Sequence, residues 1–286
     1  MKIFIDSADI EEIRQAKKWG MLDGVTTNPS LIKKAVEELH KQKERIDIKE
    51  YISQFLREVK GKPVSLEVIG TNFTDMVHEG IHLYHLFNPI ANNVYIKIPV
   101  NPCITDTGKC DSDGIRAIHA LTQRGIPINC TLIFTPEQAL LAAKAGAKIV
   151  SPFVGREDDY IREINKSRFK KEEYFPAEGM KKLKKWKNDN GIVSGVDLIK
   201  ECKAIFATQK VKGCEILAAS IRNVRQFREV ALAGADIATL PLGVMGRLLE
   251  HPKTKQGMQQ FIKDIVPEYA KVAGGQRQKT KKRGEA

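Results

Sequence analysis

The chain has 286 residues, of which 42% are hydrophobic, 29% charged and 7% aromatic, enough to bury one large core. No apolar run approaches the roughly 20 residues of a membrane-spanning helix, and the first residues lack the apolar stretch of a secretory signal, so we expect a cytoplasmic protein with no membrane partner. Five cysteines, an odd number with no CxxC pair, argue against a disulfide framework or a cysteine zinc site.

The formal net charge of +12 is concentrated in two segments. Residues 276–286 hold five basic residues and one acidic residue, and we expect a disordered tail there. Residues 166–187 are rich in lysine, interleaved with acids. Neither segment has the interleaved aromatic residues of a surface that binds single-stranded nucleic acid. We expect no nucleic-acid partner, and a polyanion- or RNA-binding protein is the alternative from another functional class.

Eight short β-branched runs predict strands. They lie at 2–6, 24–28, 64–68, 94–100, 128–134, 149–154, 214–220 and 237–242. Runs that are almost continuously apolar indicate a sheet buried on both faces, and helices between the strands imply parallel crossovers.

Helical patterns occupy most of the intervals between the strands. They cover 8–18, 48–60, 73–87, 115–124, 136–146, 195–207, 224–233 and 243–250. The first has acidic residues in its first turn, which suits the positive end of a helix dipole, and the fifth has Pro136 at its first position and Gly146 after its end.

Eight strand–helix units in about 250 residues are typical of a single (β/α)₈ TIM barrel. A doubly wound sheet is the main rival, but it should have a glycine-rich loop after the first strand, where this chain reads FIDSAD. We predict one domain, residues 1–275, with a charged insertion at about 156–190. Residues 254–272 predict an additional C-terminal helix, with Pro267 as the point where it would break.

The carboxyl ends of barrel strands are where the chemistry of this fold gathers. Seven of the eight predicted strands carry polar residues there: Asp6, Asn28, Glu67, Lys97, Thr131, Ser151 with Arg156 beyond it, and Ser220 with Arg222. Each of them alone could be a strand cap, a loop hydrogen bond or a surface charge.

Lys97 stands out because it lies inside VYIKIPV, between Ile96 and Ile98. Strand alternation directs it either to the apolar helix layer, where an ammonium is costly, or into the barrel, where an amine can attack a carbonyl. An isolated buried lysine is more often half of a structural ion pair. Here carboxylates, an amide and two arginines share the same barrel mouth, which favours Schiff-base chemistry on a phosphorylated sugar.

Seven motifs in order resemble the transaldolase family, the group that includes the compact transaldolases and the shorter fructose-6-phosphate aldolases. They are IFIDSAD at 3–9, GVTTNPSLI at 24–32, VSLEV at 64–68, YIKIPV at 95–100, INCTLIF at 128–134, SPFVGR at 151–156 and LAASIRN at 217–223. The resemblance covers roughly residues 1–252, and the TTNPS and KIP elements are specific in combination. The lysine-rich insertion and the basic tail depart from the family pattern.

The resemblance assigns roles by position. Lys97 matches the Schiff-base lysine, Asp6 the acid/base of carbon–carbon cleavage, and Glu67 with Thr131 the pair that holds a water for proton transfer. Asn28 and Ser151 match residues that bind the hydroxyls of the dihydroxyacetone part. The phosphate site of the family falls on Arg156, Ser220 and Arg222. No cofactor is implied.

The implied reaction is the pentose phosphate pathway transfer in which sedoheptulose 7-phosphate and glyceraldehyde 3-phosphate give erythrose 4-phosphate and fructose 6-phosphate. Within the family, the transferases resemble this chain in having a glutamate at Glu67 and a phenylalanine at Phe153. The aldolases, which release free dihydroxyacetone, have glutamine and tyrosine there and are the alternative. The resemblance also implies a homo-oligomer, a decamer or a smaller ring, with the C-terminal helix as a candidate contact.

His78, His82 and His85 fall at i, i+4 and i+7 of one predicted helix, a spacing that can hold zinc. This helix follows the third strand and should lie on the outside of the barrel. We therefore interpret the three histidines as a solvated face and expect no metal site.

Overall fold

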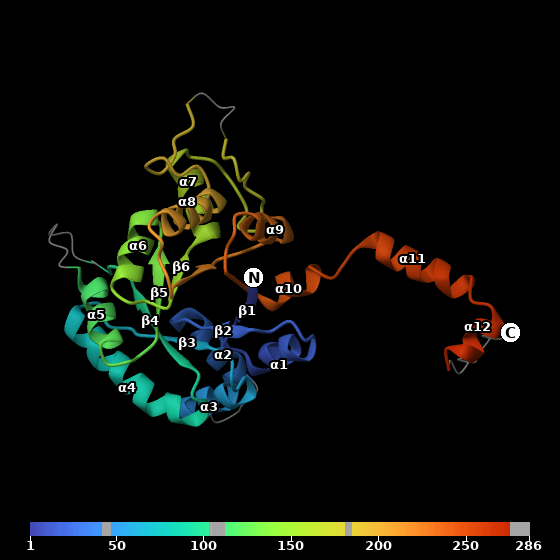
Figure 1. Cartoon of the computed structure of the whole chain (residues 1–286), viewed down its shortest axis with the longest axis horizontal. Helices are drawn as coiled ribbons and strands as arrows, with labels where there is room; N and C mark the ends of the chain where they lie inside the picture. The colour runs from blue at the N-terminus through green and yellow to red at the C-terminus, as the bar shows by residue number, and fades with distance from the viewer. Residues whose placement is uncertain (42–46, 103, 105–111, 181–184, 275–286) are drawn as a thin grey trace. The chain divides into compact units, whose positions relative to one another are not determined.

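A computed structural model describes residues 1–41, 47–102, 104, 112–180 and 185–274 of the chain (Figure 1). Its centre is a closed parallel barrel of eight strands in sequential order, which confirms the (β/α)₈ prediction. The strands are β1 (Lys2–Asp6), β2 (Gly24–Thr26), β3 (Val64–Glu67), β4 (Val94–Pro99), β5 (Ile128–Ile133), β6 (Ile149–Pro152), β7 (Glu215–Ala218) and β8 (Ile237–Leu240). Each predicted strand is present, and most end earlier than the apolar runs suggest.

Helices between the strands surround the barrel. They are α1 (Ile10–Lys18), α2 (Pro29–Lys41), α3 (Ile48–Glu58), α4 (Phe73–Ala91), α5 (Asp113–Thr122), α6 (Pro136–Lys144), α7 (Val154–Ile164), α8 (Gly195–Thr208), α9 (Val224–Leu232) and α10 (Leu242–Arg247). Their starts follow local chemistry: Asp9 accepts hydrogen bonds from the first turn of α1, and Thr135 and Gln138 form a capping box on α6.

Helix α2 is absent from the sequence prediction. Its start is nevertheless encoded, because Asn28 accepts a hydrogen bond from the backbone N–H of Leu31 at 3.0 Å and Pro29 occupies the first helical position. Only Ala35 of α2 is buried, so the apolar periodicity that would reveal the helix is weak.

Residues in register across parallel strands point to the same face of the sheet, and this decides which side chains enter the barrel. Asp6 is in register with Thr26, and Lys97 lies between Glu67 on one side and Asn129 on the other. The same interior contains an apolar cluster that includes Phe4, Ile149, Phe153, Leu217, Ala219 and Ile237.

The segment predicted as an insertion at 156–190 begins later in the structure, because α7 occupies its first nine residues. The irregular part covers 165–194, of which 181–184 lie outside the described residues. Two of its aromatic residues contact α7: the guanidinium of Arg162 lies 4.9 Å from the ring centre of Phe169 and 4.8 Å from that of Phe175.

Residues Gly246–Ala286 form a second compact unit. It contains α11 (Pro252–Lys263) and α12 (Pro267–Val272), so the single helix predicted for 254–272 is interrupted before Pro267, the first residue of α12. Neither helix buries a side chain. The basic tail predicted at 276–286 lies outside the described residues.

No helix in the described parts of the chain is both long and apolar enough to cross a membrane.

Two buried carboxyl groups, Glu157 and Asp158, lie next to each other on α7. Asp158 accepts hydrogen bonds from the backbone N–H of Gly195 and the side-chain amide of Gln226, both at 2.8 Å, and burial raises its pKa to about 7. Glu157 is fully buried and neither carboxyl oxygen has a hydrogen-bond partner within the described residues. Burial, reinforced by the nearby Asp189 and Asp158, raises the pKa of Glu157 to about 8.

These raised pKa values predict a stability that falls as pH rises. Between the ordinary carboxyl pKa of 4.5 and about 8, the folded chain keeps a proton on Glu157 that the unfolded chain has released. We expect Glu157→Gln to raise the melting temperature by about 3–6 °C at pH 8 and to change it little near pH 5. Calorimetry across this range measures the difference. Glu163→Gln, on the same helix, is the control, and equal pH dependence in both variants and the unaltered chain would contradict the assignment.

Candidate functional site

Lys97 lies inside the barrel, on β4. Its side chain is 5% exposed, and its Nζ lies 2.9 Å from Oε2 of Glu67 in an ion pair. Nζ also donates a hydrogen bond to the carbonyl oxygen of Thr27 at 3.1 Å. The ammonium is therefore held at the carboxyl ends of β2, β3 and β4, with one oxygen partner on β3 and one directly after β2.

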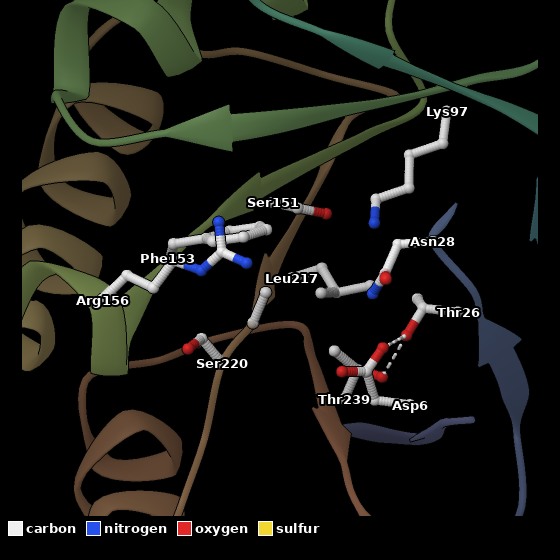
Figure 2. Close-up of a pocket in the computed structure, with 11 residues that line it drawn as sticks. Asp6, Thr26, Asn28, Lys97, Ser151, Phe153, Arg156, Leu217, Ser220 and Thr239 are labelled. Carbon is white, nitrogen blue, oxygen red and sulfur yellow. Dashed lines mark hydrogen bonds between the residues drawn. The ribbon is translucent and has the colours of Figure 1, made fainter. Parts of the chain in front are cut away.

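A cavity of about 80 Å³ opens beside this lysine (Figure 2). Seven of the residues singled out in the sequence line it: Asp6, Asn28, Lys97, Ser151, Phe153, Arg156 and Ser220. The amine enters from one side, and Arg156 stands on the opposite side, next to Phe153 and Ser220 (Figure 2). Thr26, Leu217, Ala219 and Thr239 complete the lining.

Asp6 is held by a chain of hydroxyl groups. Thr26 donates a hydrogen bond to Oδ1 of Asp6 at 2.7 Å, and the hydroxyls of Thr26 and Thr239 are 2.6 Å apart. Burial raises the pKa of the Asp6 carboxyl, although the charge of Lys97, the Thr26 hydrogen bond and the charge of Arg156 act in the opposite direction. A buried carboxylate with a raised pKa is suited to accept and return a proton.

A second polar network lies under the cavity. The Ser151 hydroxyl donates to Oδ1 of Asn129 at 2.6 Å, and the amide of Asn129 donates to the Ser65 hydroxyl at 3.0 Å. All three side chains are at most 1% exposed. Because each group of this network satisfies another, Ser151 is fixed in its orientation toward the cavity.

Glu67 and Thr131 do not line this cavity, although both belong to strands next to Lys97. Glu67 is linked to the cavity by its ion pair with Lys97, which does line it. Thr131 is fully buried on β5 in register with Pro99, and its hydroxyl has no hydrogen-bond partner within the described residues. A buried hydroxyl of this kind is ready to bind a small polar molecule.

The cationic end of the cavity is built on aromatic rings. The guanidinium of Arg156 lies 5.0 Å from the ring centre of Phe153, and this ring meets Phe134 edge-on at 5.9 Å. Ser220 has a φ of 61°, an uncommon conformation for a residue other than glycine. The loop after β7 is thus turned so that Ser220 reaches the cavity.

Arg222 is not among the residues that line the cavity. Its guanidinium forms two hydrogen bonds with Asp159 of α7, at 2.6 Å and 2.5 Å. Of the arginines singled out in the sequence, the structure therefore brings Arg156 into the cavity and places Arg222 against α7.

Sequence reasoning does not find five residues of these networks: Thr26, Ser65, Asn129, Thr239 and Asp159. The first three lie within strands, two residues before Asn28, Glu67 and Thr131, so the period of two along a strand could have found them. Thr239 is in register with Phe4, and no singled-out residue points to it. Asp159 is a helix residue, and nothing in the sequence pattern indicates its partner.

Chemically, the arrangement places a primary amine between two carboxylates. An amine in this setting can add to a ketone and form an imine, with the carboxylates moving the protons. Arginine and hydroxyl groups at the far end suit an anionic group such as a phosphate.

Comparison with known proteins shows the family of the chain. A family model described as Transaldolase/Fructose-6-phosphate aldolase matches residues 3–281. A probable transaldolase of Aquifex aeolicus is 41% identical over 270 residues, which cover 94% of this chain and 99% of the relative. Probable transaldolases of Nitrosopumilus maritimus and Thermoplasma acidophilum are each 38% identical, covering 92% of this chain and 94% and 95% of the relatives. The chain belongs to the transaldolase/fructose-6-phosphate aldolase family.

Proposed function

We propose that this enzyme is a transaldolase that transfers a dihydroxyacetone unit between sugar phosphates through a Schiff base on Lys97. The observation that carries the proposal is the buried Nζ, 2.9 Å from Glu67, beside a cavity that Asp6 and Arg156 line. The names of the relatives support transfer, since each is called a probable transaldolase.

Imine formation uses the Lys97–Glu67 pair. Glu67 accepts a proton from the ammonium, and the neutral amine attacks the C2 carbonyl of the ketose phosphate to form a carbinolamine. A proton returned to the C2 hydroxyl lets it leave as water, which gives the protonated imine. The Thr131 hydroxyl is buried on β5, the strand next to that of Lys97, and has no hydrogen-bond partner within the described residues. This supports the proposal that Thr131 helps to hold the water.

Cleavage uses Asp6. Its carboxylate accepts the proton of the C4 hydroxyl, the C3–C4 bond breaks, and its electron pair moves into the imine to give an enamine. The aldehyde product leaves, and the enamine carbon attacks the carbonyl of the incoming aldose phosphate. Asp6 then returns the proton to the new hydroxyl, and water releases the product ketose from Lys97.

Binding of the substrate rests on both ends of the cavity. We assign Asn28 and Ser151 to the hydroxyls of the dihydroxyacetone part, and Arg156 and Ser220 to the phosphate. Arg222, which does not line the cavity, would contribute its charge at the same end. Phosphate binding remote from the reacting carbons can orient C2 toward the amine and C4 toward Asp6.

Phe153 favours transfer over release of free dihydroxyacetone. Protonation of the enamine would release it, and a phenylalanine ring has no proton to donate. The ring is also held in place by contacts with Phe134 and Arg156, so the cavity wall at Phe153 is apolar. The enamine is thus kept for an aldehyde acceptor. We propose the donor and acceptor sugars that the resemblance implies, and with them the transfer of the pentose phosphate pathway.

Borohydride trapping tests the mechanism directly. With fructose 6-phosphate, reduction of the imine should attach the three- or six-carbon unit to Lys97, because a reduced imine can no longer hydrolyse. Peptide mass mapping locates the adduct. Lys97→Ala should form none, whereas Lys148→Ala should keep it. An adduct on another lysine, or none in the unaltered chain, would remove the proposal.

A second test separates transferase from aldolase. Phe153→Tyr adds a hydroxyl that can donate a proton to the enamine, so dihydroxyacetone should accumulate without an acceptor aldehyde, about tenfold faster than in the unaltered chain. Enzymatic assay of free dihydroxyacetone measures it. Rapid release by the unaltered chain itself would show that the aldolase alternative is right.

We also propose that the enzyme is a homo-oligomer, a decamer or a smaller ring. Large apolar side chains of α11 and α12 support this, since Phe261, Ile262 and Tyr269 are each more than 60% exposed. Light scattering of the full chain should give an oligomer that Phe261→Asp weakens. A monomer before the substitution would contradict it.

A reducing cytoplasm suits the three described cysteines, all of them free.

A further inference from the structure

The ion pair between Arg222 and Asp159 lies next to the cationic end of the cavity. Both side chains are largely buried, at 17% and 14% exposure, and Asp159 binds both terminal nitrogens of the guanidinium. Such a two-point contact fixes the plane of the group as well as its position. Asp159 is the third residue after Arg156 on α7, and Arg222 is the second after Ser220.

On its Nε side the guanidinium lies against Gly155, where an added Cβ would be 2.8 Å from Nε of Arg222. Gly155 directly precedes Arg156, and its backbone N–H donates a hydrogen bond to the carbonyl oxygen of Ser220. Arg222 therefore has Asp159 as its ion-pair partner and Gly155 as its neighbour, and Gly155 adjoins Arg156 and Ser220, which line the cavity.

The insertion contacts the same guanidinium. Nη1 of Arg222 donates a hydrogen bond to the carbonyl oxygen of Lys171 at 3.2 Å. This part of the insertion is anchored on both sides, because Arg162 donates to the carbonyl oxygen of Glu173 at 2.9 Å and the Tyr174 hydroxyl donates to Glu229 of α9 at 2.6 Å. Figure 1 shows the segment passing from α7 toward α8 beside α9.

We propose that Asp159, together with the backbone of the insertion at Lys171, is the positioning device for Arg222 and so sets how tightly the site holds the substrate phosphate. The inference rests on the proposed function for the identity of the substrate. It gives the insertion a role in the site, because the insertion helps to keep Arg222 oriented toward the phosphate end.

The physical reason is the cost of ordering a long cationic side chain. A guanidinium that is already fixed loses little rotamer freedom when phosphate binds, whereas a mobile one must be ordered by the ligand. Without the carboxylate, Arg222 would also lose the charged partner Asp159 while remaining mostly buried. The effect should fall on phosphate affinity and leave the chemistry at Lys97 unchanged.

Calorimetric titration of the full chain with inorganic phosphate tests the proposal. Asp159→Asn keeps the shape but removes the charge, and phosphate should bind about tenfold more weakly. Glu163→Gln removes a charge from the same helix and should have no effect. Asp159→Glu keeps the charge and should restore part of the affinity, which also covers the case in which Asp159→Asn does not fold.

Steady-state kinetics supplies a second readout that a general loss of structure would not give. In Asp159→Asn, KM for fructose 6-phosphate should rise about tenfold while kcat stays within about twofold. With unphosphorylated fructose, kcat/KM should equal that of the unaltered chain.

Unchanged or tighter phosphate binding by folded Asp159→Asn would overturn the proposal, as would failure of the unaltered chain to bind phosphate. An equal loss of kcat/KM with phosphorylated and unphosphorylated donor would also overturn it. The proposed function is tested separately by the Lys97 adduct. An adduct together with normal phosphate affinity in Asp159→Asn would remove only the role of Asp159.

Discussion

An ammonium group buried in the interior of an apolar barrel must have oxygen partners, and this requirement organises the site. Lys97 is supplied with them by the strands that precede its own: the carboxylate of Glu67 on β3 and the carbonyl of Thr27 after β2. The closed barrel makes this supply possible, because register places Glu67, Lys97 and Asn129 side by side on one inner face. The amine that is costly to bury as an ammonium is the same group that the proposed chemistry uses.

The rest of the interior is divided between support and function. Phe4, Leu217 and Ile237 belong to the apolar cluster that fills the barrel, while the hydroxyl and amide groups nearer the mouth satisfy one another. Thr239 bonds to Thr26, which bonds to Asp6, and Asn129 joins Ser65 to Ser151. These networks hold the oxygens of Asp6 and Ser151 in place without leaving their partners unpaired. Strands carry the groups that we propose to react, and the proposed phosphate end is carried by the start of α7 and the loop after β7.

The sequence predicts the barrel well because its strands are short β-branched runs separated by capped helices, signals that act locally. It predicts the cavity residues for the same reason, since polar side chains at the ends of apolar runs are conspicuous. Sequence reasoning misses helix α2 because the helix buries little and its start signal, Asn28-Pro29, lies inside the TTNPS motif. Arg222 shows the limit of such reasoning. Its place against Asp159 depends on how α7 and the loop after β7 meet, which no local pattern of residues encodes.

The most direct test of this account is the structure of the enzyme after borohydride reduction in fructose 6-phosphate. We predict a covalent bond from Lys97 Nζ to the substrate C2, with Asp6 within hydrogen-bond distance of the position of C4. The phosphate, in a six-carbon adduct, should contact Arg156 and Ser220. A bond to any other residue, or a sugar whose phosphate points away from Arg156 and whose carbons lie out of reach of Asp6, would contradict the account.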